Sequence, residues 1–86
     1  MLAMSTLVVS ASVWPGPFED GLAARDRGDF AAAVHTFKSL AQSGDANSQF
    51  QLSLLYAAGK GVKADNKQAL YWLRQAATRG NTQAQS

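Results

Sequence analysis

Few side chains in this sequence could perform catalysis or bind a metal, and their spacing does not bring them together. His35 is the only histidine, and the absence of cysteine removes disulfides, thiolate ligands and cysteine nucleophiles. Three aspartates, Asp29, Asp45 and Asp65, could suggest acid–base chemistry between carboxylates. Each of them, however, directly precedes a segment with helical periodicity, where aspartate caps the first turn. We therefore interpret them as helix caps, and His35 as a surface or boundary residue.

Two further patterns suggest ligands but are explained without them. Gly59-x-Gly61 lacks the third glycine of a dinucleotide-binding loop and lies between helical segments, not after a strand. Lys60, Lys63 and Lys67 form a basic cluster, but no aromatic residues alternate with them, and the net charge of the 86-residue chain is only +2. We expect no cofactor, no metal ion and no nucleic acid.

The stretch from Asp45 to Gly80 is predicted to form a helix, a glycine-rich turn and a second helix. Four residues of the first helix recur at steps of three and four and therefore share one face: Ala46, Gln49, Leu52 and Tyr56. Gly59 and Gly61 end that helix, because glycine adopts a left-handed backbone at little cost. After the Asp65 cap, the predicted buried face of the second helix is Ala69, Leu70, Leu73, Ala76 and Ala77, with Trp72 beside it.

The pattern repeats along the chain. Aligning Asp29 with Asp65 also aligns Ala33 with Ala69, Ala41 with Ala77, Gly44 with Gly80 and Gln49 with Gln85, and it matches Val34 with Leu70 and Phe37 with Leu73. A spacing of roughly 20–50 residues is typical of helical solenoids. Helices are therefore also predicted over residues 18–27 and 30–43. The buried face of the latter would be Phe30, Ala33, Val34, Phe37, Leu40 and Ala41.

A family resemblance follows from these positions. The run Leu52-Ser-x-x-Tyr56-x-x-Gly59-x-Gly61-Val62-x-x-Asp65, followed by Ala69, Trp72, Ala76-Ala77 and Gly80, resembles the Sel1-like repeat, a relative of the tetratricopeptide repeat. Ser53 departs from the glycine usual in that family. The resemblance implies an α/α superhelix that acts as an adaptor or scaffold, often in exported bacterial proteins.

The predicted fold is all-α, a solenoid of two antiparallel hairpins with the start of a third. Its segments are a signal peptide over residues 1–14, a degenerate tetratricopeptide-like pair over 15–44, a Sel1-like repeat over 45–80, and the start of a further helix or a frayed tail over 81–86.

Residues 1–14 carry no charge and include the apolar run Leu7-Val8-Val9, which favours an export signal with a cleavage site near Ala11. The run is shorter than the roughly 20 residues that span a bilayer, so no stable membrane span is expected. A periplasmic or secreted location is predicted, with a cytoplasmic one as the alternative.

The expected function is non-enzymatic binding of an unidentified protein or peptide. The first helix of each pair lines the concave side of a helical solenoid. The residues predicted to contact a partner are Asn47, Phe50, Gln51 and Leu54, with contact to a neighbouring helix as the alternative. Self-association through an uncovered face at Trp72 and Leu73 is also expected. The alternative functions are a small exported hydrolase of the Sel1-like type and a fragment of a longer repeat protein.

Overall fold

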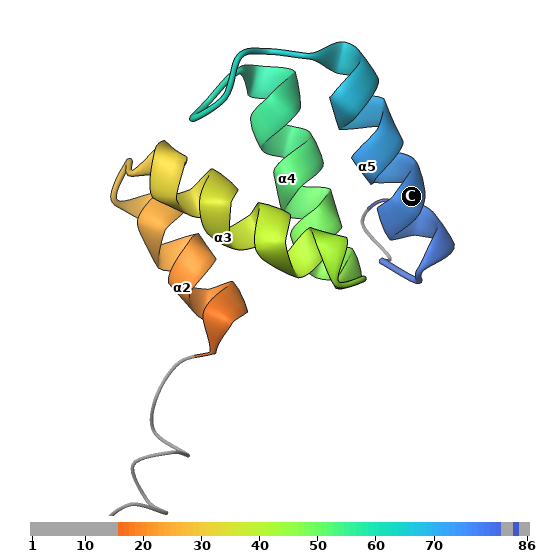
Figure 1. Ribbon diagram of the computed structural model, residues 1–86, viewed down its shortest axis with the longest axis horizontal. Helices are drawn as coiled ribbons and strands as arrows, with labels where there is room; N and C mark the ends of the chain where they lie inside the picture. Colours follow the sequence, from red (N-terminus) through yellow and green to blue (C-terminus); the bar gives the residue numbers. More distant parts are fainter. Residues whose placement is uncertain (1–15, 82–83, 85–86) are drawn as a thin grey trace, which may run out of the picture.

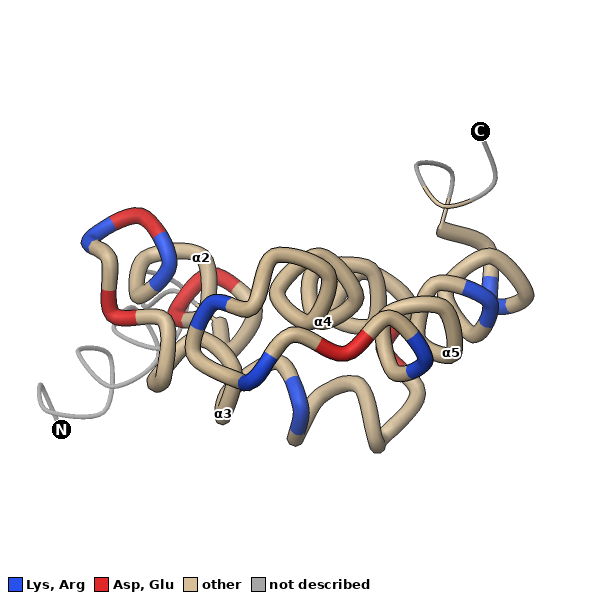
Figure 2. Tube along the Cα trace, turned by 90° about the horizontal axis from the view of Figure 1, so that it is seen from above, with Lys and Arg blue, Asp and Glu red and all other residues tan. Residues whose placement is uncertain are grey.

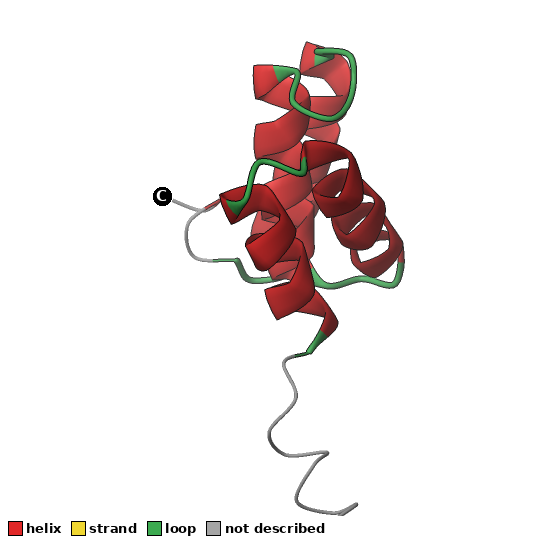
Figure 3. Cartoon of the chain, turned by 90° about the vertical axis from the view of Figure 1, so that its left-hand side faces the viewer, coloured by secondary structure: helices red, strands yellow, loops and turns green. Residues whose placement is uncertain are grey.

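The computed structural model describes residues 16–81 and residue 84, and within them the protein consists of helices and loops (Figure 3). The helices are α2 (Pro17–Asp26), α3 (Phe30–Gln42), α4 (Ala46–Ala58) and α5 (Asn66–Thr78), and each packs against the next along the chain (Figure 1). The α2–α3 hairpin lies at one end and α5 at the other, with α4 between them (Figure 2). The predicted all-α repeat fold is confirmed. The predicted signal peptide lies outside the described residues.

Aspartates begin three of the four helices. The carboxylates of Asp29, Asp45 and Asp65 accept backbone N–H bonds from the first turn, at 3.3 Å from Ala32, 2.9 Å from Ser48 and 3.0 Å from Lys67. These bonds satisfy donors that have no partner within the helix. The caps are as predicted, and they account for the recurrence of aspartate without acid–base chemistry.

The same glycine turn ends three helical segments. Gly28, Gly44 and Gly80 have φ of +84°, +102° and +97°. The residue after each glycine donates its N–H to a carbonyl five positions back: Asp29 to Ala24 at 2.8 Å, Asp45 to Leu40 at 3.1 Å and Asn81 to Ala76 at 2.9 Å. This is the Schellman pattern, and it needs a left-handed residue. Because the residue before the glycine already caps the helix, α2 ends at Asp26 and α3 at Gln42, one residue earlier than predicted.

The core lies on both sides of α3. The buried residues of α3 are Ala33, Val34, Phe37 and Ala41, as predicted, whereas Phe30 and Leu40 are only half-buried. From α2, Ala24 is buried and the ring of Phe18 lies 5.5 Å from that of Phe37. From α4, Leu52 and Leu55 complete the cluster. Helix α3 therefore joins the two hairpins.

The buried faces of α4 and α5 differ from the prediction. Helix α4 buries a wider face, which adds Ser48, Ser53 and Leu55, because it packs against both α3 and α5. Helix α5 buries a narrower one. Leu70 was expected in the core but is 46% exposed, because no described element covers that side of α5.

Candidate protein-interaction surface

The α4–α5 loop contacts the preceding hairpin. Gly61 has φ +77°, and a Cβ placed on it would lie 2.6 Å from the carbonyl carbon of Phe30 and 2.9 Å from Cγ2 of Val34. Only glycine allows so close an approach to the first turn of α3. The sequence predicts Gly61 as a turn residue. The structure adds that the turn packs against α3.

The loop also places a cation and an apolar side chain on α3. The Lys60 ammonium lies 5.0 Å from the centroid of the Phe30 ring, within the range of a cation–π contact. Val62 packs against the core cluster. The position of Lys60 is thus set by the two glycines on either side of it.

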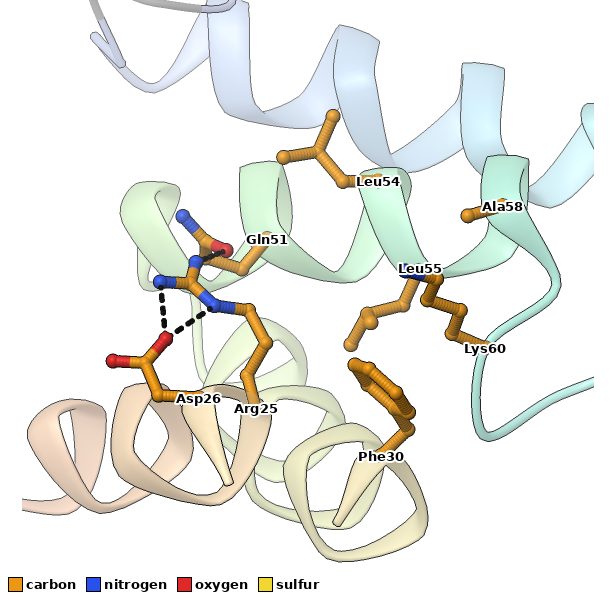
Figure 4. A pocket seen from close by; sticks show the side chains of 8 residues that line it. All are labelled: Arg25, Asp26, Phe30, Gln51, Leu54, Leu55, Ala58 and Lys60. Carbon is orange, nitrogen blue, oxygen red and sulfur yellow. Dashed lines mark hydrogen bonds and ion pairs between the residues drawn. The ribbon is translucent and has the colours of Figure 1, made fainter. Parts of the chain in front are cut away.

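A groove of about 450 Å³ lies where the two hairpins meet (Figure 4). We call it the hairpin groove, and its lining residues are Arg25, Asp26, Phe30, Gln51, Leu54, Leu55, Ala58 and Lys60. Residues from the end of α2, the start of α3, the helix α4 and the α4–α5 loop all contribute. Its middle is apolar, and polar or charged side chains stand beside it.

A hydrogen-bond network fixes the polar side of the hairpin groove. Arg25 Nη1 donates to Gln51 Oε1 at 2.7 Å, which ties α2 to α4. The same guanidinium donates to Asp26 Oδ1 from Nε at 3.3 Å and from Nη2 at 3.1 Å. The charge of Arg25 is therefore largely compensated by Asp26, which leaves Lys60 as the lining cation with no ion pair among the described residues.

The four residues predicted to bind a partner do not all lie together. Gln51 and Leu54 line the hairpin groove, and Leu54 is 46% exposed. Phe50 is half-buried and is not a lining residue. Asn47 is exposed, and its Oδ1 accepts a 2.7 Å bond from Asn81 Nδ2, so it links α4 to the segment after α5.

Arg25, Phe30 and Lys60 belong to the groove but were not predicted. Arg25 and Phe30 come from the first hairpin, and no local pattern shows that they face α4. The sequence does indicate that Lys60 lies in a turn, because it stands between Gly59 and Gly61, but not that this turn reaches the groove.

The remaining predicted repeat residues have structural positions. Leu52 and Ala76 are fully buried, while Ala46, Tyr56, Ala69, Trp72 and Ala77 are half-buried. Gly59, Gly61 and Gly80 have left-handed backbone conformations. Asn81 aligns with Asp45, and its Oδ1 accepts a 2.8 Å bond from the N–H of Ala84, which is helical. The capping contact of α4 therefore recurs after α5.

Groups suited to catalysis or metal binding do not converge in the described part of the chain. His35 is exposed on α3, and residues 16–81 and 84 contain no cluster of three or more potential metal ligands. No helix within those residues is long and apolar enough to cross a membrane. Acidic and basic residues are mixed along α2, whereas basic ones predominate from the α4–α5 loop onward (Figure 2).

Comparison with known proteins assigns the second hairpin to a family. The model of the Sel1 repeat matches residues 46–81, which begin directly after the Asp45 cap and include α4, the glycine loop and α5. No solved structure matches the chain. Residues 46–81 are therefore a Sel1 repeat.

Proposed function

We propose that the chain is a non-enzymatic adaptor module that binds an extended or helical segment of another protein in the hairpin groove. Sel1 repeats are generally protein-interaction modules, which supports the class of function. The observation that carries the proposal is that Leu54, which is 46% exposed, lines the same groove as Phe30 and Lys60, on the surface where the two hairpins meet.

The apolar part of the hairpin groove supplies a reason for binding. Phe30, Leu54, Leu55 and Ala58 contribute its apolar lining. Burying an exposed aliphatic side chain yields about 1.5–3 kcal/mol, and the half that Leu54 still exposes yields roughly half of that. A partner side chain seated against the apolar lining of the groove would gain a similar amount from its own burial. An aliphatic or aromatic anchor is therefore the first feature of the partner segment.

The charged part of the groove supplies specificity. Lys60 has no ion pair among the described residues, while Arg25 already bonds Asp26 and Gln51. A carboxylate near the apolar anchor would pair with Lys60 and complete its charge balance, whereas a cation would be repelled. The second feature of the partner segment is thus an acidic side chain.

The test is selection of peptides that bind the full chain, followed by affinity measurement with the best peptide by fluorescence anisotropy. Leu54→Ala and Lys60→Ala are each expected to weaken binding about 5- to 10-fold. His35→Ala, on an exposed position of α3 outside the groove, is the control and should leave the affinity unchanged. Unchanged affinity in both groove variants would refute the proposal.

We also propose that the module acts outside the cytoplasm, on the basis of the uncharged, apolar residues 1–14. Fractionation of an expressing bacterium should recover it in the periplasm or medium, with a mature N-terminus between Ala11 and Pro15. Recovery of an uncleaved chain in the cytoplasm alone would contradict this.

A further inference from the structure

The exposed large apolar side chains of the described residues gather on the second hairpin. Leu54, Leu70 and Tyr71 are exposed by 46%, 46% and 52%. Leu70 lines two adjacent hollows. One, of about 350 Å³, is lined by Ser53, Leu54, Ala57, Asn66, Ala69, Leu70 and Leu73. The other, of about 420 Å³, is lined by Lys67, Leu70, Tyr71, Arg74 and Gln75. We call these two hollows together the α5 face.

The internal repeat shows what kind of element fits such a face. Ala69, Leu70 and Leu73 align with Ala33, Val34 and Phe37 of α3. Those three residues of α3 are 0%, 7% and 0% exposed, because α4 and α2 pack around them. Of the three on α5, Leu70 is exposed and the other two are half-buried. The same small-and-large apolar pattern therefore receives a helix in one repeat, whereas in the next no element among residues 16–81 and 84 covers it.

The charges around the α5 face restrict the partner further. Lys67 and Arg74 line the hollow beside Leu70 and Tyr71, and neither forms an ion pair among the described residues. No carboxylate lines either hollow. Two copies of this chain joined by their α5 faces would bring these cations together, which costs energy. An acidic occupant would instead pair with them.

We infer that the α5 face is a docking site for an amphipathic helix of a partner protein. The aliphatic stripe of that helix packs on Leu54, Leu70 and Leu73, in the way that α4 packs on α3, and its flanking carboxylates pair with Lys67 and Arg74. This is the helix-in-groove mode of recognition. The α5 face differs from the hairpin groove in every lining residue except Leu54, which lines both.

The test uses two stapled helical peptides with the same aliphatic stripe, one flanked by glutamates and the other by lysines, titrated into the full ¹⁵N-labelled chain. The glutamate peptide is expected to bind at least 10-fold more tightly and to shift the amide signals of Leu70, Tyr71 and Leu73. Leu70→Asp should weaken it at least 10-fold, and Arg74→Glu, which leaves one carboxylate beside the remaining cation Lys67, should abolish the preference between the peptides. His35→Ala, at an exposed position of α3 that lines neither the hairpin groove nor the α5 face, is the control that leaves binding unchanged.

Three outcomes would overturn the inference. The first is equal affinity for the two peptides, and the second is binding that neither Leu70→Asp nor Arg74→Glu alters. The third is sedimentation of the wild-type chain as a dimer that Arg74→Glu, which keeps the apolar residues, leaves intact and Leu70→Asp dissociates. This last result would assign the face to a second copy of the chain. Since Arg74 is exposed, its substitution tests the site even if Leu70→Asp impairs folding.

Discussion

Replacement of Gly61 by alanine tests whether the Sel1 loop packs against α3. Two costs add at this position. The left-handed backbone, φ +77°, disfavours alanine by about 1–2 kcal/mol, of which about 0.4–1 kcal/mol is offset by a more restricted unfolded chain. The new Cβ would also lie 2.6 Å from the carbonyl carbon of Phe30, a backbone atom that cannot rotate away. Overpacking of this kind costs about 1–3 kcal/mol.

The matched control is Gly28→Ala. Gly28 has a similar φ of +84°, but a Cβ on it would meet no atom within 4 Å. It therefore carries the backbone cost alone, about 0.5–1.5 kcal/mol, whereas Gly61→Ala should lose about 2–4 kcal/mol. One kcal/mol shifts the Tm of a chain this size by about 4–8 °C.

The assay is thermal unfolding of the two variants and the wild type, monitored by circular dichroism at 222 nm. Gly61→Ala is expected to melt about 5–20 °C below Gly28→Ala, or to show no cooperative transition. If the two variants melted within about 2 °C of each other, the loop would not be in contact with α3, and the description of how the hairpins join would be wrong.

Three other predictions concern the second hairpin and use the same unfolding assay. Leu52→Ala should cost about 2–5 kcal/mol of stability, because Leu52 is fully buried. Leu54→Ala should cost less than about 1 kcal/mol, because Leu54 is half-exposed. Equal losses in the two variants would contradict the assignment of Leu54 to the surface. Gln49 donates a 3.0 Å bond to the Ala41 carbonyl, while its own Oε1 is buried without a partner. Gln49→Leu should therefore change the free energy of unfolding by less than about 1 kcal/mol, whereas Gln49→Glu, which buries a charge, should lower it by several kcal/mol. A larger loss in Gln49→Leu than in Gln49→Glu would refute this reasoning. Asp45→Ala removes the α4 cap and should cost about 1 kcal/mol, and Asp45→Asn should restore most of it.

Much of the fold could be predicted from the sequence because its signals are local. An aspartate cap acts on the next turn, and a left-handed glycine acts on the turn before it, so Asp45, Asp65 and Gly80 mark helix ends without knowledge of the rest of the chain. The repeat of these signals then predicts the order of the hairpins. Burial on α3 also follows from periodicity, because helices cover it on both sides.

The candidate site was less predictable because it depends on contacts between hairpins. Periodicity assigns Leu70 to an apolar face, but whether a neighbour covers that face is not a property of the helix itself. Arg25 of the first hairpin bonds Gln51 of the second, and no sequence pattern around either residue indicates this pairing. Asn47 illustrates the same point, since its position off the apolar face suggests a free side chain, while in the structure it bonds Asn81.

Chemical-shift mapping shows whether a partner segment binds where the two hairpins meet. The full ¹⁵N-labelled chain is titrated with the peptide selected for binding. We expect the largest amide shifts on Arg25, Phe30, Leu54 and Lys60, which lie in different segments of the chain and share the hairpin groove. Shifts confined to α5, or to the outer side of α2 away from Lys60, would contradict it.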